Sequence, residues 1–151
     1  MPRLNAFELV DIVLDEGSFL SWDSAPIRPA GGISAAYAAA LDAAAQKSGV
    51  DESIITGEGT IDGRRVAVIA GEFRFLAGSI GVAAAERLVD AIERATLEGL
   101  PLLAGPASGG TRMQEGTIAF LSMVKITNAV IAHRKAGLPY LVYLRHPTTG
   151  G

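Results

Sequence analysis

Two glycine pairs in this 151-residue sequence have the residue types and surroundings that could hold a negatively charged reaction intermediate. The first is Gly109-Gly110, which follows Ser108 and an apolar run, and we expect a helix to begin directly after it. Glycine lets a ligand approach the backbone closely, and the first turn of a helix offers unpaired N–H donors and a partial positive charge. The segment therefore predicts an anion-binding turn, although the same glycines would also suit an ordinary strand-to-helix turn.

The second pair is Gly150-Gly151, which follows the segment Pro147-Thr148-Thr149. Residues 139–144 before it have the apolar pattern of a buried strand. A glycine pair at each of two strand exits would allow both turns to face one ligand. We therefore expect the two turns to form one pocket.

A third glycine-containing turn, Ala77-Gly-Ser-Ile-Gly81, precedes a predicted amphipathic helix. The start of that helix would be suited to a phosphate group, and Arg87, one to two turns further on, would add positive charge. The alternative is that these glycines only allow close packing between the helix and a sheet. Both interpretations remain open at the level of the sequence.

The helices and strands that must position these turns are predicted from the spacing of apolar residues and from the turn residues between them. The hairpin is the clearest local prediction, because Asp62-Gly63 is well suited to a two-residue hairpin turn. The expected elements are a short amphipathic lead-in (4–19), a loop able to act as a docking arm (21–32), a surface helix (34–47), a hairpin (54–61 and 64–70), an amphipathic helix (81–98), a short buried strand (101–105) and a long helix that is mostly core (114–136). This pattern by itself supports only an α/β fold class.

Composition excludes several classes of protein. A net charge of −3 with 13 scattered Lys and Arg residues argues against non-specific nucleic-acid binding. No apolar run is long enough to span a bilayer. The sequence has no cysteine, which excludes disulfides and thiolate chemistry, and its start lacks the features of a signal peptide. We therefore expect a cytoplasmic protein without a metal site.

Three isolated polar residues have ordinary explanations. His133 lies near the end of a predicted helix, where we expect solvent exposure, and His146 is expected to be a loop histidine. Lys125 lies in the long apolar helix, where it either extends to the surface or pairs with a carboxylate; we prefer the first.

Four sequence blocks together carry a family resemblance. They are Gly-Glu-Gly-Thr-Ile-Asp-Gly (57–63), Phe-Arg-Phe-Leu-Ala-Gly-Ser-Ile-Gly (73–81), Ser-Gly-Gly-Thr-Arg-Met-Gln-Glu-Gly (108–116) and Pro-Thr-Thr-Gly-Gly (147–151). In this order and approximate spacing, the chain resembles the β-type half of biotin-dependent acyl-CoA carboxyltransferases, as in acetyl-CoA carboxylase. It departs from that family in lacking the four-cysteine zinc ribbon of many such subunits, so no zinc is expected, and in having Ala77 where a glycine is usual.

The resemblance implies a crotonase-like fold of repeated ββα units, incomplete in this chain. Residues 1–50 would form a helical and loop lead-in, and residues 51–151 the N-terminal part of the carboxyltransferase domain. The resemblance also implies backbone oxyanion holes, with the Arg112 and Glu115 side chains supporting the first turn. The implied catalytic residues are Gly109, Gly110, Gly150 and Gly151, and the implied residues for binding acyl-CoA or biotin are Gly78, Ser79, Gly81, Arg87, Ser108 and Arg112.

The implied reaction moves a carboxyl group from carboxybiotin on a partner carrier protein to the α-carbon of an acyl-CoA, as in fatty acid biosynthesis. The implied partners are a second carboxyltransferase half or subunit, the biotin carboxyl carrier protein and biotin carboxylase, in an oligomer. We expect a chain ending at Gly151 to be a fragment that is inactive alone. Two alternatives stay open: a malonyl-thioester decarboxylase subunit of the same fold, and a non-catalytic module that pairs with a carboxyltransferase partner.

Overall fold

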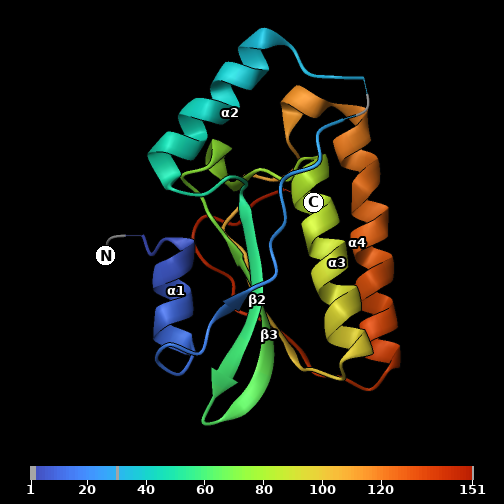
Figure 1. Cartoon of the computed structure of the whole chain (residues 1–151). Coiled ribbons are helices and arrows are strands. Elements are labelled where there is room, and N and C mark those ends of the chain that lie inside the picture. Colours follow the sequence, from blue (N-terminus) through green and yellow to red (C-terminus); the bar gives the residue numbers. More distant parts are fainter. Residues whose placement is uncertain (1–2, 30, 151) are drawn as a thin grey trace.

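The computed structural model describes residues 3–29 and 31–150, and Figure 1 shows them as a sheet with helices on both faces. The strands follow one another across the sheet in the order β1-β2-β3-β4-β5. Their bounds are β1 Leu20–Ser21, β2 Ile54–Ile61, β3 Arg64–Gly71, β4 Leu102–Gly105 and β5 Tyr140–Val142. The helices are α1 Ala6–Val13, α2 Ala35–Ser48, α3 Val82–Leu97 and α4 Thr117–Lys135, with short 3-10 turns η1 Leu76–Gly78 and η2 Met113–Glu115.

The sheet is mixed, and its parallel part positions the glycine turns. Strands β1, β2 and β3 pair antiparallel, whereas β3, β4 and β5 pair parallel, with α3 and α4 as the connections. Parallel strands end at the same edge of a sheet. The segments that leave β3, β4 and β5 therefore meet at one edge, and these segments carry the three glycine-containing turns.

The core forms two layers because successive residues of a strand point to opposite faces. In β3, Val66, Val68 and Ala70 belong to the cluster that also contains the buried residues of α1 and α2. Ala67 and Ile69 belong to the opposite cluster, with α3 and Ala129 of α4. The lead-in helix α1 thus shares a core with β3, and the division of the chain at residue 50 stays a prediction.

Most of the predicted elements are confirmed. The hairpin β2–β3 pairs Ile61 with Arg64 across the Asp62-Gly63 turn. Helix α2 begins after Ser34, whose side chain accepts a hydrogen bond from the Tyr37 N–H, and ends at Gly49. The long helix expected over 114–136 begins three residues later, at Thr117, because residues 113–115 form the short turn η2.

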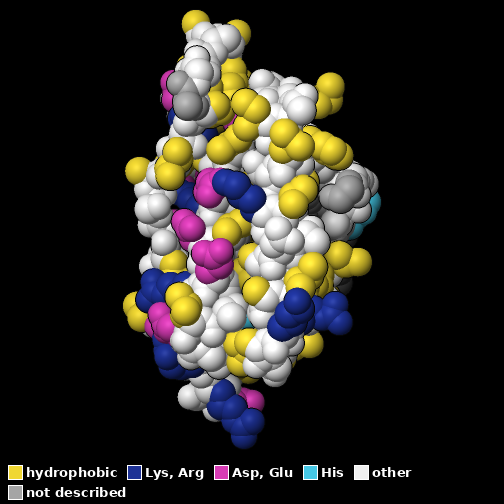
Figure 2. All heavy atoms as spheres, turned by 90° about the vertical axis from the view of Figure 1, so that its right-hand side faces the viewer, with side chains coloured by type: hydrophobic (Ala, Val, Ile, Leu, Met, Phe, Trp, Pro, Cys, Tyr) yellow, Lys and Arg dark blue, Asp and Glu magenta, His cyan; other side chains and the backbone are white. Residues whose placement is uncertain are grey.

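Two elements are less buried than the sequence predicted (Figure 2). Helix α4 was expected to be mostly core, but it leaves several apolar side chains exposed, because it packs mainly against α3 on one side. The segment 139–144 was expected to be a buried strand, but β5 is an edge strand. The exposed apolar residues in these regions are Ile118, Phe120, Leu121, Val124, Ile131, Leu141, Val142, Tyr143 and Leu144.

One polar residue on α4 differs from the prediction. His133 was expected in solvent but is fully buried, and its ring nitrogens lie 2.9 Å from Thr96 Oγ1 and 3.2 Å from the Pro139 carbonyl oxygen. The Lys125 side chain reaches the surface as preferred, and its Nζ also lies 2.5 Å from Glu86 Oε1. This pairing with a carboxylate was the less favoured of the two predictions. Within the described ranges, no helix is both long and apolar enough to cross a membrane.

Candidate active site

The three glycine-containing turns meet at the carboxyl edge of β3, β4 and β5. Isolated bridges join Ile80 to Thr111 and Ser108 to Thr148. The Ile80 N–H donates to the Gly110 carbonyl oxygen at 2.9 Å, and the Thr149 N–H donates to the Ser108 carbonyl oxygen at 2.9 Å. The middle turn, 106–112, is thus hydrogen-bonded to the other two.

Gly110 and Gly150 lie in direct backbone contact. A Cβ atom on Gly150 would come within 2.7 Å of the Gly110 Cα, and one on Gly110 within 3.2 Å of the Gly150 Cα. Both residues have positive φ, +101° and +91°, which side-chain-bearing residues rarely adopt. Glycine is therefore required at both positions by space and by conformation. Gly151, the other predicted catalytic residue of this turn, lies outside the described residues.

The N–H groups of the two turns differ in their partners. The Gly109 N–H donates to the Ala77 carbonyl oxygen at 2.9 Å, and the Gly110 N–H donates to Ser108 Oγ at 3.0 Å. No acceptor for the Gly150 N–H is found among residues 3–29 and 31–150, and Gly150 is exposed. Of these three N–H groups, the Gly150 N–H is therefore the one that can donate a hydrogen bond to a ligand.

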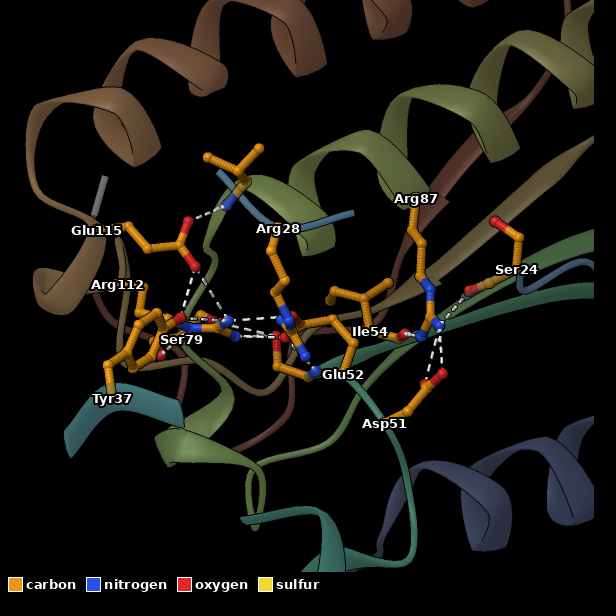
Figure 3. Close-up of polar contacts among 12 residues, drawn as sticks. Ser24, Arg28, Tyr37, Asp51, Glu52, Ile54, Ser79, Arg87, Arg112 and Glu115 are labelled. Carbon is orange, nitrogen blue, oxygen red and sulfur yellow. Dashed lines mark hydrogen bonds and ion pairs between the residues drawn. The ribbon is translucent and has the colours of Figure 1, made fainter. Parts of the chain in front are cut away.

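Arg112 lies fully buried directly after the first glycine pair and holds the neighbouring turns together (Figure 3). Its guanidinium forms a two-pronged ion pair with Glu52, with one distance of 3.0 Å from Nη1 to Oε2. It also donates to the Ser79 carbonyl oxygen at 2.6 Å and to Ser79 Oγ at 3.2 Å. Ser79 is therefore fixed by Arg112.

Glu115 connects the same network to α2 and α3 (Figure 3). Its Oε1 lies 3.6 Å from Arg112 Nη1, which confirms the predicted pairing of these two side chains, and it accepts a hydrogen bond of 2.5 Å from the Tyr37 hydroxyl. Its Oε2 accepts a hydrogen bond of 2.5 Å from the Val82 N–H, the first N–H of α3. A carboxylate from the chain itself thus sits at the start of α3.

The pKa values of this network follow from burial and charge. Burial would raise the pKa of Glu52, but the hydrogen bonds and charge of Arg112 outweigh it and hold that pKa below its ordinary value of 4.5. Burial also opposes the charge of Arg112, yet Glu52 raises the pKa of the guanidinium. Burial and the hydrogen bond to Glu115 raise the pKa of Tyr37 to about 12. The ion pair is charged and Tyr37 is neutral at physiological pH.

These contacts favour the second interpretation of the turn before α3, in which its glycines allow close packing, over a phosphate site. The first N–H group of α3 is used by Glu115, and Gly81 lies against the Glu115 carboxylate. Arg87 is buried, and its guanidinium donates to the Ile54 carbonyl oxygen at 3.0 Å and to Asp51 at 2.8 Å (Figure 3). Arg87 faces β2 and the loop before it, so it is a structural residue here and not a free phosphate ligand.

The other predicted binding residues lie inside the same scaffold. Gly78 is buried, and a Cβ atom there would come within 2.1 Å of the Ala107 carbonyl oxygen. Ser108 is buried with its hydroxyl directed at the Gly110 N–H. The structure thus brings these predicted residues together as the framework of the turns, with Gly109, Gly150 and Ala77 at the surface.

A groove of about 840 Å³ opens beside this framework. It lies between α2 and residues 72–77 and ends at the exposed Ala77. Three cationic residues and one carboxylate line it: Arg3, whose guanidinium lies over the Phe73 ring at 5.0 Å, Lys47, Arg74 and the buried Glu72, so that positive charge is in excess. Its positive charge and its position beside Ala77 make this groove a better candidate for a phosphate-containing ligand than the start of α3.

Sequence reasoning missed several residues of the site. Glu52 and Tyr37 were not named, because their partners Arg112 and Glu115 lie far away in the sequence and no local pattern marks the pairing. Arg145 was also missed, although an arginine just before the Pro-Thr-Thr-Gly motif was a visible signal. Among the described residues, no cluster of three or more His, Cys, Asp or Glu side chains could hold a metal ion.

The mixed sheet with helices on both faces and the joined glycine turns define a partial crotonase-like α/β domain of the carboxyltransferase type. Residues 2–151 match the carboxyl transferase domain model, and the chain belongs to this family. A "Probable biotin-dependent acyl-coenzyme A carboxylase beta3 subunit" of Mycobacterium tuberculosis (strain ATCC 25618 / H37Rv) is 63% identical over 151 residues, 100% of this chain and 30% of the relative. The acetyl-coenzyme A carboxylase carboxyl transferase subunit beta of Synechococcus sp. (strain WH7803) is 42% identical, covering 99% of this chain and 52% of the relative.

Solved structures agree on the fold. Transcarboxylase 12S with hydrolysed methylmalonyl-coenzyme A bound superposes with a TM-score of 0.76 at 27% identity, over 94% of this chain and 26% of that one. A Pseudomonas malonate decarboxylase MdcD-MdcE hetero-dimer has a TM-score of 0.67 at 22% identity, over 92% of this chain and 51% of that one, which shows the fold alone. The chain thus spans 30% of the mycobacterial relatives' length, and relatives named as carboxylases do not favour the decarboxylase alternative.

Proposed function

We propose that this chain forms part of the carboxyltransferase component of a biotin-dependent acyl-CoA carboxylase of the acetyl-CoA type. The observation that carries the proposal is the contact between the Gly110 and Gly150 turns at the shared edge of β4 and β5. Carboxybiotin on a carrier protein would supply the carboxyl group. The residues of this chain would bind the acyl thioester and stabilise the negative charge that develops when its α-carbon reacts.

The Gly150 turn is the proposed donor to the thioester oxygen, together with Gly151. Gly109 and Gly110 form the facing wall, whose backbone is held in place by Ala77 and Ser108. Fixed backbone donors need no reorganisation during reaction, and removal of one such donor lowers kcat by roughly 10²- to 10³-fold in enzymes that use them. No acid–base side chain at the turns is required for this role.

The groove between α2 and residues 72–77 is the proposed site for the CoA moiety. Lys47 and Arg74 would contact its phosphates, because both are exposed and line the groove. Ala77 would connect the groove to the glycine turns. This assignment replaces Arg87 and the start of α3 in the proposed binding of CoA.

The partners follow from the same proposal. They are a biotin carboxyl carrier protein, biotin carboxylase and a second carboxyltransferase half, in a cytoplasmic oligomer that serves fatty acid biosynthesis. The exposed apolar faces of α4 and β5 are available for contact with further parts of such an assembly.

The test uses a chimera in which these 151 residues replace the matching segment of the mycobacterial beta3 subunit, to which they are 63% identical. The assay follows radiolabelled carboxyl transfer from malonyl-CoA to a biotinylated carrier protein. The proposal predicts that malonyl-CoA loses its labelled carboxyl group only when the biotinylated carrier protein is present. Carrier-independent release of CO₂ would support the decarboxylase alternative, and no turnover in an assembled chimera would support the interaction module.

A further inference from the structure

The guanidinium of Arg145 is inserted between the ends of two neighbouring strands, just before the Gly150 turn. It donates to the carbonyl oxygen of Gly105 at 3.2 Å from Nε and 2.9 Å from Nη2, and Nη2 also donates to the carbonyl oxygen of Gly71. Nη1 donates to the carbonyl oxygen of Leu4 at 3.1 Å. One side chain thus binds the last residues of β3 and β4 and the segment before α1.

This arrangement matches the chemistry of arginine. A guanidinium has five N–H donors in a rigid planar fork and no acceptor, so it can bind several carbonyl oxygens at once. Burial lowers the pKa of Arg145, and the nearby Glu72 carboxylate counteracts this effect. The same carboxylate accepts a hydrogen bond of 2.8 Å from the Ala6 N–H at the start of α1.

The backbone around Arg145 leads directly into the glycine turn. The Arg145 N–H donates to the Pro106 carbonyl oxygen at 3.1 Å. The Thr148 hydroxyl lies within hydrogen-bond distance of the carbonyl oxygens of Arg145 and Pro106. The Ser108 N–H donates to the Pro147 carbonyl oxygen at 2.9 Å. The chain on either side of Arg145 is therefore tied to residues 105–108, which lead into the first glycine pair.

We infer that Arg145 is a positioning residue for the candidate active site. Its guanidinium fixes residues 145–150 to the ends of β3 and β4, and so sets where Gly150 lies relative to Gly110. The role of this position in carboxyl transfer rests on the proposed function. The positioning itself does not, because it concerns only the geometry of two turns within this chain.

The first experiment measures positioning without activity, by NMR-detected amide hydrogen exchange in the 151-residue chain. Arg145→Met keeps the apolar stem and removes the fork, and Arg145→Lys keeps a charge that cannot reach both strands. We expect the protection of the Ser108 and Thr149 amides to fall about tenfold in both variants, because each variant loses hydrogen bonds donated by a charged group. The amide of Ile92 in α3 should keep its protection, and Arg64→Met, which changes an exposed arginine at the start of β3, should change none of the three.

Unchanged protection of Ser108 and Thr149 in both variants would overturn the inference. An equal loss at Ile92 in both variants would also overturn it, because Arg145 would then support the whole fold and not the turn.

The second experiment measures carboxyl transfer in the chimera that carries these 151 residues in the mycobacterial beta3 subunit. We expect Arg145→Lys to lower kcat by about 10- to 100-fold, with the acyl-CoA KM changed by less than about twofold. An unchanged kcat together with lost amide protection would overturn the role in the reaction. If the parent chimera transfers no carboxyl group, the proposed function fails, and the exchange experiment still decides whether Arg145 positions the turn.

Discussion

Gly110 and Gly150 come from two different strand exits and touch through their backbones, so that a Cβ atom on Gly150 would come within 2.7 Å of the Gly110 Cα, and one on Gly110 within 3.2 Å of the Gly150 Cα. The contact arises because β4 and β5 are parallel, so that the segments leaving them emerge side by side. It turns two sequence motifs into one structural unit. The proposed carboxyltransferase function depends on this unit.

The contact predicts that both glycines resist substitution more than an ordinary glycine with positive φ. Gly110→Ala would hold its Cβ atom in a tight contact, 3.2 Å from the Gly150 Cα, and would also keep an unfavourable positive φ, which costs about 1–2 kcal/mol. Overpacking in a tight site typically adds about 1–3 kcal/mol. Urea unfolding should therefore show a larger loss of stability for Gly110→Ala than for a matched control.

The control is Gly137→Ala at the end of α4. Gly137 has φ +75°, and nothing lies within 4 Å of where its Cβ atom would be. Its substitution should cost only the backbone term of about 1–2 kcal/mol. Equal losses in the two variants would contradict the tight contact.

The buried pair of Glu52 and Arg112 predicts strong coupling. Both side chains are fully buried. Arg112→Met leaves the Glu52 carboxylate with the partly exposed Arg28, at 3.1 Å, as its remaining cationic partner, and should cost about 3 kcal/mol. Glu52→Gln should cost a similar amount. The double variant should lose much less than the sum, as measured by urea unfolding in a double-mutant cycle. Additive losses would mean that the two side chains do not interact.

Glu52 also predicts how stability depends on pH. Its pKa in the folded chain lies below its ordinary value of 4.5. A group with a lowered pKa contributes stability above the unfolded value, and this contribution is lost as pH falls through the folded value. Unfolding curves of the parent chain should lose stability as pH falls below 4.5, and Glu52→Gln should lose less over the same range. If the stability of the parent and of Glu52→Gln fell equally as pH decreased, Glu52 would not be the source of the pH dependence.

Tyr37 predicts an effect at the opposite end of the pH scale. Its pKa is raised to about 12, so its stabilising contribution is present below the ordinary value of 10 and is lost as pH rises through the folded value. Tyr37→Phe removes a hydrogen bond to a carboxylate and should cost about 1.5–3 kcal/mol at neutral pH. Ultraviolet titration of phenolate absorbance should show one tyrosine that ionises near 12 in the parent and is missing from Tyr37→Phe.

The groove beside α2 predicts which cations bind CoA. Lys47→Met and Arg74→Met should each raise the Kd for acetyl-CoA by about tenfold with little change in stability. Arg87→Met should lower stability and leave the Kd for acetyl-CoA little changed, because the Arg87 guanidinium is buried and paired with Asp51. Calorimetric titration and urea unfolding of the three variants in the chimera separate these effects. Weaker binding only in Arg87→Met would return the phosphate site to the start of α3.

The sequence predicted those parts of the fold that depend on local interactions. The Asp62-Gly63 hairpin turn and the caps of α2 at Ser34 and Gly49 lie where the residue types require them. The two glycine pairs were recognised because glycine at strand exits is a local signal. The sequence also predicted that the two turns lie near each other, in one pocket, but it did not predict their direct backbone contact.

The remaining features depend on partners that are distant in the sequence. His133 resembled an exposed residue at a helix end, but Thr96 and Pro139 from other elements bury it. The sequence at the start of α3 is typical of a free anion site, but the Glu115 carboxylate accepts the hydrogen bond of the first N–H group of the helix. The apolar pattern of α4 indicated a core helix, because a hydrophobic face looks the same whether or not a partner covers it.

The most direct measurement of the central claim is carboxyl transfer by the chimera carrying Gly150→Ala, with acetyl-CoA binding measured on the same protein. Gly150 is exposed, and its N–H is the proposed donor to the thioester oxygen. Gly150→Ala keeps the backbone N–H, but its Cβ atom would come within 2.7 Å of the Gly110 Cα at a φ of +91°, so the turn must shift and the N–H is displaced. The proposed function therefore predicts that kcat falls by about 10²- to 10³-fold, while the Kd for acetyl-CoA changes by less than about threefold. A kcat equal to that of the parent chimera, in a folded variant, would contradict the claim that the facing glycine turns form the reaction site.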